Sequence, residues 1–246
     1  MRTLWLILLF PISVNAQLDE MSKADSKVKG LVKEMRVVRD MVRMVGDSLV
    51  YGERWTNQIY FFNDNGKIAK SYSLPRYAGT DTSFYVYSYS EDGDLLNVQY
   101  DASKGKSTHR HFNSFSKYAD GQLIEDRIEY GDKSMLLHKY RYYADSMEQL
   151  QYESDSQVRV KIVYLYDDKK NIVEKKQYYI GEPLSISSYE YDVFNNMILC
   201  KTYKGAVLDD VFTYDYEYDE HHNFIKRTEY KNKRIYSISK RDIVYQ

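Results

Sequence analysis

A tyrosine-bearing hairpin motif recurs along most of this 246-residue chain, and it limits the possible folds more than any other sequence feature. Each copy has alternating aromatic residues, a polar turn, an aliphatic residue and a second tyrosine-containing segment. In the three clearest copies a tyrosine, at 166, 191 or 218, is followed five residues later by asparagine, seven later by an aliphatic residue and twelve later by tyrosine. Such fixed spacing predicts a repeat architecture.

Weaker copies of the motif lie N-terminal to these three, so that clear repeats cover about residues 55–235. Equivalent turns fall at positions 66, 93, 121, 147, 170, 195 and 222, with a mean spacing of about 26 residues. That period leaves room for two strands of roughly 8 to 10 residues and a tight turn. A parallel crossover would need more chain, so the repeat is predicted to be an antiparallel hairpin.

The strands alternate as hairpin strands should. Between Val211 and Asp219, Phe212 and three tyrosines point one way, while Thr213, Asp215 and Glu217 point the other. The turns agree, since Asp, Asn and Gly at these positions tolerate a positive φ and bond their own backbone. One face of the sheet is therefore expected to be aromatic and the other largely charged.

The segment before the first clear copy is ambiguous, because its apolar residues also satisfy a helical period that Gly46 could end. Its richness in valine, and the need of a repeat array for a capping element, favour an opening hairpin over about residues 28–55. With this hairpin the seven repeats would make sixteen strands.

Sixteen strands are too many for a flat open sheet. The predicted fold is all-β, with antiparallel hairpins forming a long curled meander, as an arc or a partly closed barrel, and tyrosines on the concave or better buried side. An outer-membrane barrel is the alternative. It is disfavoured because charges such as Lys161 and Glu217 lie opposite the tyrosines, and a mid-membrane Lys or Arg on the lipid face costs about 2–4 kcal/mol.

The first residues read as an export signal, with Arg2 before an apolar run and small residues at 14–16. The expected organisation is a signal peptide at 1–16, a flexible polar lead at 17–27 and one repeat domain at 28–246. The product is expected in the periplasm or outside the cell, without spanning a membrane once the signal is cleaved. The net charge of −1 provides no field for nucleic acid.

The residues that could act in catalysis or bind a metal ion have structural explanations. Asp167, Asp192 and Asp219 recur with the repeat, which marks them as turn residues, whereas a catalytic pair would occur once. His109 and His111 share a strand face but lack further ligands at diagnostic spacing, so no metal is predicted. Cys200 is expected to be a small buried hydrophobe. We expect no enzyme activity and no cofactor.

The segments that begin at 166, 191 and 218 follow the pattern Tyr-Asp-x-x-Gly/Asn-Asn-x-aliphatic. This pattern resembles the YD repeat of the Rhs family of secreted bacterial proteins, and the tyrosine-rich exported proteins of unknown function of Bacteroides-type bacteria. Lys170 and His222 depart from it, since they stand where glycine is expected. The resemblance implies a wrapping, scaffold or surface-recognition role.

Two functions remain from the sequence. The first is a non-catalytic binding module whose tyrosine-rich face contacts a glycan, protein or peptide, since aromatic rings stack on sugars and anchor interfaces. The residues expected to contribute are Tyr164, Tyr189, Tyr191, Tyr214 and Tyr216. The alternative is a periplasmic structural or assembly-assisting protein that uses edge-strand pairing near residues 28–55 and 235–246.

Overall fold

The computed structural model describes residues 30–74, 82–91, 94–102, 111–131, 133–152, 157–179 and 184–245. The predicted signal at 1–16, the lead at 17–27, the turn at 93 and His109 lie outside these ranges. The described strands are β1 (Val32–Val45), β2 (Ser48–Phe62), β3 (Ile68–Ser73), β4 (Ser83–Tyr89), β5 (Leu95–Ala102), β6 (His111–Ala119), β7 (Gln122–Tyr130), β8 (Met135–Tyr142), β9 (Ser146–Tyr152), β10 (Val158–Tyr166), β11 (Ile172–Tyr179), β12 (Ser185–Tyr191), β13 (Met197–Lys204), β14 (Val207–Tyr218), β15 (Phe224–Lys231) and β16 (Arg234–Tyr245).

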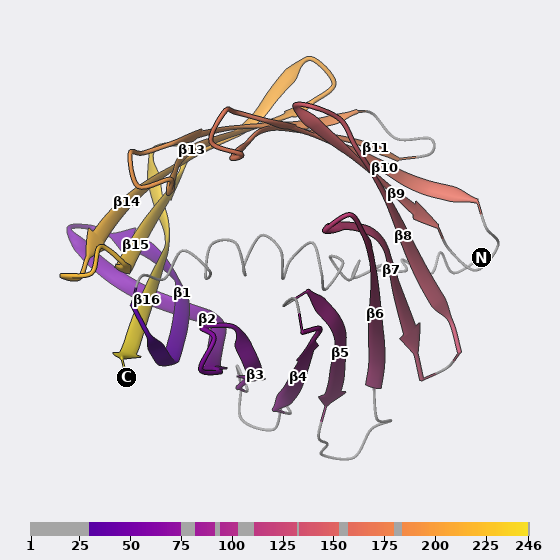
Figure 1. Ribbon diagram of the computed structural model, residues 1–246. Helices are drawn as coiled ribbons and strands as arrows, with labels where there is room; N and C mark the ends of the chain where they lie inside the picture. The colour runs from indigo at the N-terminus through magenta and orange to yellow at the C-terminus, as the bar shows by residue number, and fades with distance from the viewer. Residues whose placement is uncertain are drawn as a thin grey trace, which may run out of the picture.

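The sixteen strands form one closed barrel in which each strand pairs with its neighbours in the chain, and β1 pairs with β16 (Figure 1). The closing pair is antiparallel, with Met35 opposite Ile243 and Met41 opposite Ser237. The predictions of an all-β antiparallel fold and of an opening hairpin in place of a helix are confirmed. The prediction of an open arc or a partly closed barrel is wrong, because the first and last strands complete the ring.

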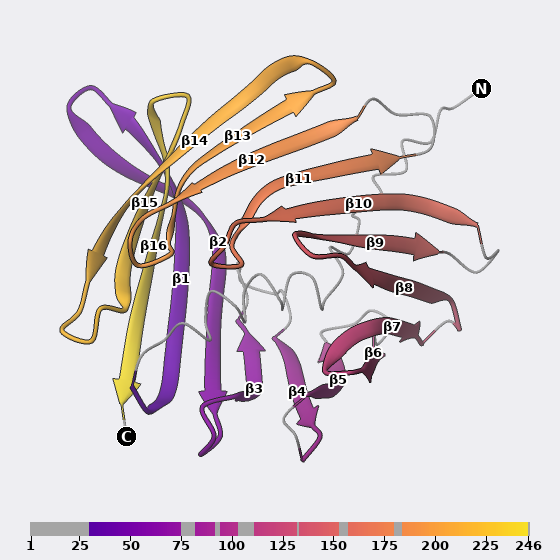
Figure 2. The same cartoon turned by 45° about the horizontal axis from the view of Figure 1, so that its top comes forward.

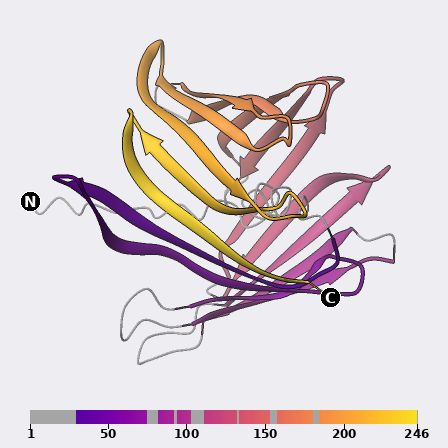
Figure 3. The same ribbon diagram turned by 90° about the vertical axis from the view of Figure 1, so that its left-hand side faces the viewer.

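Closure could not be predicted from the repeat, because it depends on a tilt and stagger that all the strands share. The stagger shows in the hairpins, which extend unequally from the ring (Figures 2 and 3). Pairing of β1 with β16 ends at Met41, whereas its pairing with β2 continues to Val45 opposite Ser48.

The two faces of the wall differ in how well they are shielded. Ser114 and Ser237 are fully buried on one face, whereas on the other the side chains of Arg127 and Glu129 remain 45% and 46% exposed. Small side chains are covered where a curved sheet is concave, so we assign the first face to the interior of the barrel. This face carries the predicted tyrosines, and in β14 it alternates with exposed Thr213, Asp215 and Glu217, as the sequence indicates.

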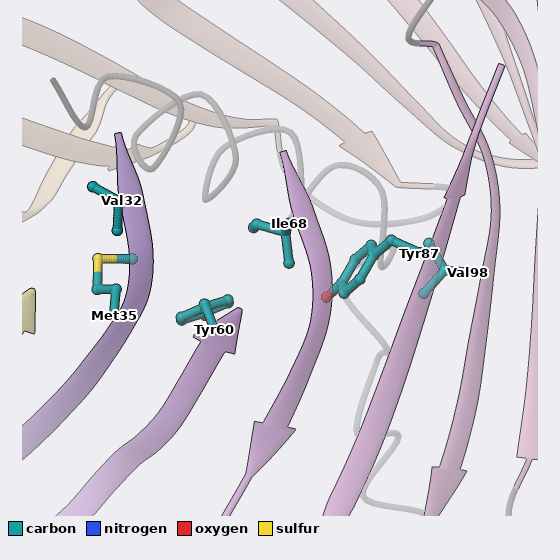
Figure 4. Close-up of a cluster of buried hydrophobic side chains, with 6 residues drawn as sticks. All are labelled: Val32, Met35, Tyr60, Ile68, Tyr87 and Val98. Atoms are coloured by element: carbon teal, nitrogen blue, oxygen red, sulfur yellow. The ribbon is translucent and has the colours of Figure 1, made fainter. Parts of the chain in front are cut away.

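Buried apolar side chains form local clusters along the inner wall. The largest cluster joins Met35 and Tyr60 to Tyr87 and Val98, with Val32 and Ile68 beside them (Figure 4). Met35 and Val98 are fully buried in this cluster, and the large rings of Tyr60 and Tyr87 are buried with them. Cys200 is also buried, as predicted, and lies between Tyr189 and Phe212 on adjacent strands.

The tight turns lie where the repeat predicts them, with one exception. Gly66, Lys170, Asn195 and His222 all adopt positive φ, between 60° and 72°. Lys170 and His222 thus take the conformation for which the motif uses glycine. The turn expected around Met147 is displaced, because Met147 belongs to β9 and the chain reverses at 143–146, where the Tyr143 amide donates to the Ser146 carbonyl at 2.9 Å.

Candidate binding surface on the inner face of the barrel

The five tyrosines singled out from the sequence come from three inner-wall regions. Tyr164 belongs to β10, Tyr189 and Tyr191 to β12, and Tyr214 and Tyr216 to β14. They are separated by β11 and β13, which contribute inward polar side chains such as Gln177 opposite Ile162 and Thr202 opposite Ser187. The structure therefore places them on one face as a broad surface, without gathering them at a point.

Several of these tyrosines also hold the wall together through their hydroxyls. Tyr191 donates to the Ile172 carbonyl at 2.7 Å, and Tyr216 donates to the Met197 carbonyl at 2.6 Å. Tyr164, which is buried, donates to Gln149 Oε1 at 3.2 Å. The rings of the half-buried tyrosines remain the part available to a ligand, while these hydroxyls fix their orientation.

The repeating aspartates order the tight turns at one end of the barrel, namely the turns after β10, β12 and β14. Asp192 Oδ1 accepts the backbone amides of Phe194 and Asn196, each at 2.8 Å. Asp167 and Asp219 accept the corresponding amides in their own turns. The aspartates are therefore turn residues, as predicted, and their regular bonds explain why they recur.

Two of these carboxyls titrate below their usual range. The side-chain amide of Asn171, with the backbone amides of Asn171 and Lys169, lowers the pKa of Asp167. Burial alone would raise the pKa of Asp219, but hydrogen bonds from Tyr245 and from the amides of Asn223 and His221 outweigh it and lower the pKa.

A buried polar network crosses β6, β7 and β8. Ser114 Oγ donates to Asp126 Oδ1 at 2.9 Å, and Asp126 Oδ2 lies 3.4 Å from His138 Nδ1. All three side chains are fully buried, and His138 Nε2 has no hydrogen-bond partner in the part of the chain that the structure describes. The carboxylate lies between the serine and the histidine, which differs from a nucleophilic triad, where the histidine contacts the hydroxyl.

A second polar group lies where the barrel closes, on β1, β15 and β16. We call it the seam cluster, and its members are Arg39, Arg227, Glu229, Ser237, Ser239 and Arg241. Arg39 forms an ion pair with Glu229 and donates from Nε to Ser237 Oγ at 3.0 Å, and Ser237 donates to Glu229 Oε2 at 2.6 Å.

Neither polar group was identified from the sequence. The available signal was the strand alternation, which places Arg227 and Glu229 in phase on one face of β15, but the partner strands were unknown. Within the described ranges, no group of three or more His, Cys, Asp or Glu residues is placed to hold a metal ion. No helix there is long and apolar enough to cross a membrane.

Comparison with known proteins finds likeness in fold only. No protein family and no curated protein matches the sequence. Among solved structures, a porin-like protein from Bacteroides uniformis superposes with a TM-score of 0.50 at 10% identity, covering 87% of this chain and 96% of that chain. A porin-like protein from Bacteroides vulgatus gives a TM-score of 0.42 at 13% identity, covering 89% of this chain and 99% of that chain.

These findings define the class of fold as a closed, porin-like β-barrel, a form consistent with the predicted export to the cell envelope. They contradict the prediction that the chain does not span a membrane. That prediction assumed an open or partly open sheet, whereas a closed barrel pairs every strand edge, as a membrane-spanning β structure must. The resemblance to YD repeats remains a prediction, since neither porin-like structure bears on it.

Proposed function

We propose that the chain is a non-catalytic outer-membrane β-barrel whose tyrosine-rich inner face binds a glycan or peptide ligand. The observation that carries this proposal is the antiparallel pairing of β1 with β16, which closes sixteen strands into one ring. Sixteen strands about 4.8 Å apart, tilted by about 40°, give a barrel about 30 Å across its backbone. Barrels of this strand number can enclose an aqueous interior.

Several charges on the outer face occur in opposite pairs across neighbouring strands. Lys161 Nζ lies 2.9 Å from Glu148 Oε2, and Lys226 Nζ lies 2.5 Å from Glu217 Oε1. An unpaired Lys or Arg on the lipid face would cost about 2–4 kcal/mol at mid-membrane and less near the interfaces. Pairing lowers the cost of each charge, so the proposal requires these pairs to remain intact.

The binding role rests on the chemistry of the inner wall. Half-buried tyrosine rings alternate there with serine, threonine and glutamine, a combination suited to stacking on sugar faces and to hydrogen bonding. The edge-pairing alternative loses its basis in the described strands, because β1 and β16 pair with each other. An assembly role would have to use another surface.

Replacing Tyr191 and Tyr216 together by alanine tests the binding role. We expect loss of binding on a glycan and peptide array, while circular dichroism still reports the native sheet. The matched control replaces Tyr178 and Tyr230, which lie on the outer face of β11 and β15, opposite Lys161 and Thr213. Equal binding by both variants, or equal loss, would overturn the role of the inner face.

The array result must be separated from simple unfolding. Tyr191→Phe with Tyr216→Phe removes the hydroxyls, with their bonds to the Ile172 and Met197 carbonyls, and keeps both rings. If ring stacking binds the ligand, the phenylalanine variant retains most of the affinity. Loss of affinity in a folded phenylalanine variant would contradict stacking.

A further inference from the structure

The seam cluster concentrates positive charge on the inner wall. It contains three guanidinium groups and one carboxylate, so its net charge is +2 at neutral pH. Arg39 is the group paired with Glu229. Asp210, an inward carboxylate on β14, forms an ion pair with Lys231 of β15 at 2.8 Å.

The register places the cluster's arginines around one small side chain. Ser239 of β16 lies directly opposite Arg227 of β15 and directly opposite Arg39 of β1. Two strand spacings of about 4.8 Å therefore separate the backbones of the two arginines. Arg241 follows Ser239 by two residues on the same face of β16. The small side chain of Ser239 therefore has three arginines as its neighbours on the inner face, namely Arg39, Arg227 and Arg241.

Aromatic rings lie beside two arginines of the cluster, Arg227 and Arg241. The Arg241 guanidinium lies 3.4 Å from the ring centroid of Phe224, and the Arg227 guanidinium lies 5.5 Å from that of Tyr214. Stacking on rings holds the planar guanidinium while leaving its edge donors able to reach an anion. Arg227 Nε is buried and finds no hydrogen-bond partner among the described residues, while the same guanidinium forms a hydrogen bond with Tyr216.

Burial strengthens any ionic contact made here. Glu229, Ser237, Ser239 and Arg241 are all buried. Charge-assisted hydrogen bonds from arginine to carboxylate or phosphate are strong and often bidentate. A site with net positive charge, a serine hydroxyl and ring-held guanidiniums has the chemistry to bind an anionic group.

We infer that the seam cluster is a binding site for the anionic group, carboxylate or phosphate, of a small solute inside the barrel. The inference rests on the proposed binding role of the inner face and adds the charge of the ligand to it. The solute would approach Arg227 and Arg241, with Ser239 between them and Arg39. The Arg39–Glu229 pair would hold the wall closed beside it.

The test measures binding of inorganic phosphate and of succinate to the full chain purified in detergent, by isothermal titration at fixed ionic strength. One of the two anions should bind, and its identity distinguishes a phosphate from a carboxylate ligand. Arg227→Gln and Arg241→Gln should each weaken binding about tenfold or more, the usual scale for loss of one charge-assisted bond. If neither anion binds the wild-type chain, the inference is wrong.

Lys240→Gln is the matched control. Lys240 is the residue between Ser239 and Arg241, it is exposed, and it lies on the outer face opposite Lys226. Its replacement removes the same charge from the same strand and should leave binding unchanged. Equal weakening by Lys240→Gln and Arg241→Gln would show a general charge effect and would overturn the site.

The glutamine variants could fail to fold, so Arg227→Lys and Arg241→Lys provide a second series. Lysine keeps the charge and loses the planar, bidentate fork. Each lysine variant should fold and bind several-fold more weakly than wild type, whereas unchanged binding in both would contradict the inferred contact. The titration needs no bilayer, so a chain that fails to insert into membranes yet binds anions refutes the proposed location and leaves this site standing.

Discussion

Tyr218 Oη donates a hydrogen bond of 2.7 Å to Asp192 Oδ2, which joins the end of β14 to the turn between β12 and β13. The same relationship recurs one repeat later, where Tyr245 donates to Asp219. In both cases the turn asparagine also donates to the tyrosine, from Asn196 at 3.0 Å and from Asn223 at 2.8 Å. In these two repeats the hairpin is therefore fastened to the turn of the preceding one, and the Tyr-Asp motif connects the repeats.

Asp192→Ala should destabilise the barrel, because it removes both amide bonds of the turn and the bond to Tyr218. We expect a loss of about 1–3 kcal/mol in the free energy of unfolding, measured with urea in detergent. Tyr218→Phe, which removes one donor, should cost about 1 kcal/mol. The control is Asp168→Ala in an exposed turn position; an equal loss there would contradict the account.

Acid should lower the stability of the barrel by protonating Asp167 and Asp219 in their turns. Their pKa values are lowered in the folded chain, so their contribution to stability is present above the ordinary value of about 3.9 and is lost as the pH falls through the folded pKa. Asn63 makes the equivalent turn bonds without a charge, to the amides of Asn65 and Lys67. Asp167→Asn with Asp219→Asn removes this contribution, so the double variant should melt somewhat lower at neutral pH and lose less further stability below about pH 5.

The control for this pH profile is Asp168→Asn, which removes a neighbouring charge without touching the turn bonds. Its profile should follow that of the wild-type chain. If the double variant and the wild-type chain lose stability in parallel below pH 5, the two carboxyls are not responsible for acid sensitivity.

Lys170→Gly should stabilise the turn after β10. Lys170 has φ of 64°, a left-handed conformation that costs an L-residue roughly 1–2 kcal/mol and costs glycine little. Glycine also has more freedom to lose on folding, so we expect a net gain of up to about 1 kcal/mol. The neighbouring Lys169→Gly should be neutral or destabilising.

The reciprocal change Gly66→Ala, where no described atom lies within 4 Å of an added Cβ, should cost about 1 kcal/mol through the backbone alone.

Glu148→Ala should destabilise the membrane-inserted chain more than the detergent-solubilised chain. It removes the partner of Lys161 at 2.9 Å and of Arg141 at 3.7 Å, and leaves two cations on the outer face. An uncompensated cation on a lipid face costs up to about 2–4 kcal/mol. Glu148→Leu combined with Lys161→Leu should restore stability in lipid. Urea unfolding in vesicles and in detergent measures both, and no difference between the two media would count against lipid contact.

Much of the fold follows from local patterns. The alternation in β14 correctly divides Tyr214 and Tyr216 from Asp215 and Glu217, since a strand places successive side chains on opposite faces. The turn positions at 170, 195 and 222 were found because Asp, Asn and their spacing report a local conformation. The shifted turn before Met147 was missed because that copy lacks the asparagine or glycine that marks the other copies.

Relations between distant strands could not be read in this way. The pairing of Met35 with Ile243, and hence the closed ring, depends on the accumulated tilt and stagger of every strand between them. The same is true of Arg39 and Glu229, which closure brings together, whereas Ser114, Asp126 and His138 lie on consecutive strands and meet through their register. The predicted arc was wrong for this reason, and with it the prediction that the chain stays out of the membrane.

The central claim is that the barrel wall has lipid outside and solute inside, and adjacent serines of β12 test it directly. Ser187 faces inward opposite Thr202, and Ser188 faces outward opposite Lys201. With Cys200 replaced by serine, each is changed to cysteine and labelled with an environment-sensitive fluorophore in outer-membrane vesicles. We expect spin-labelled lipid to quench the probe at 188 and aqueous iodide alone to quench the probe at 187. Quenching of both probes by iodide and of neither by lipid would contradict the claim.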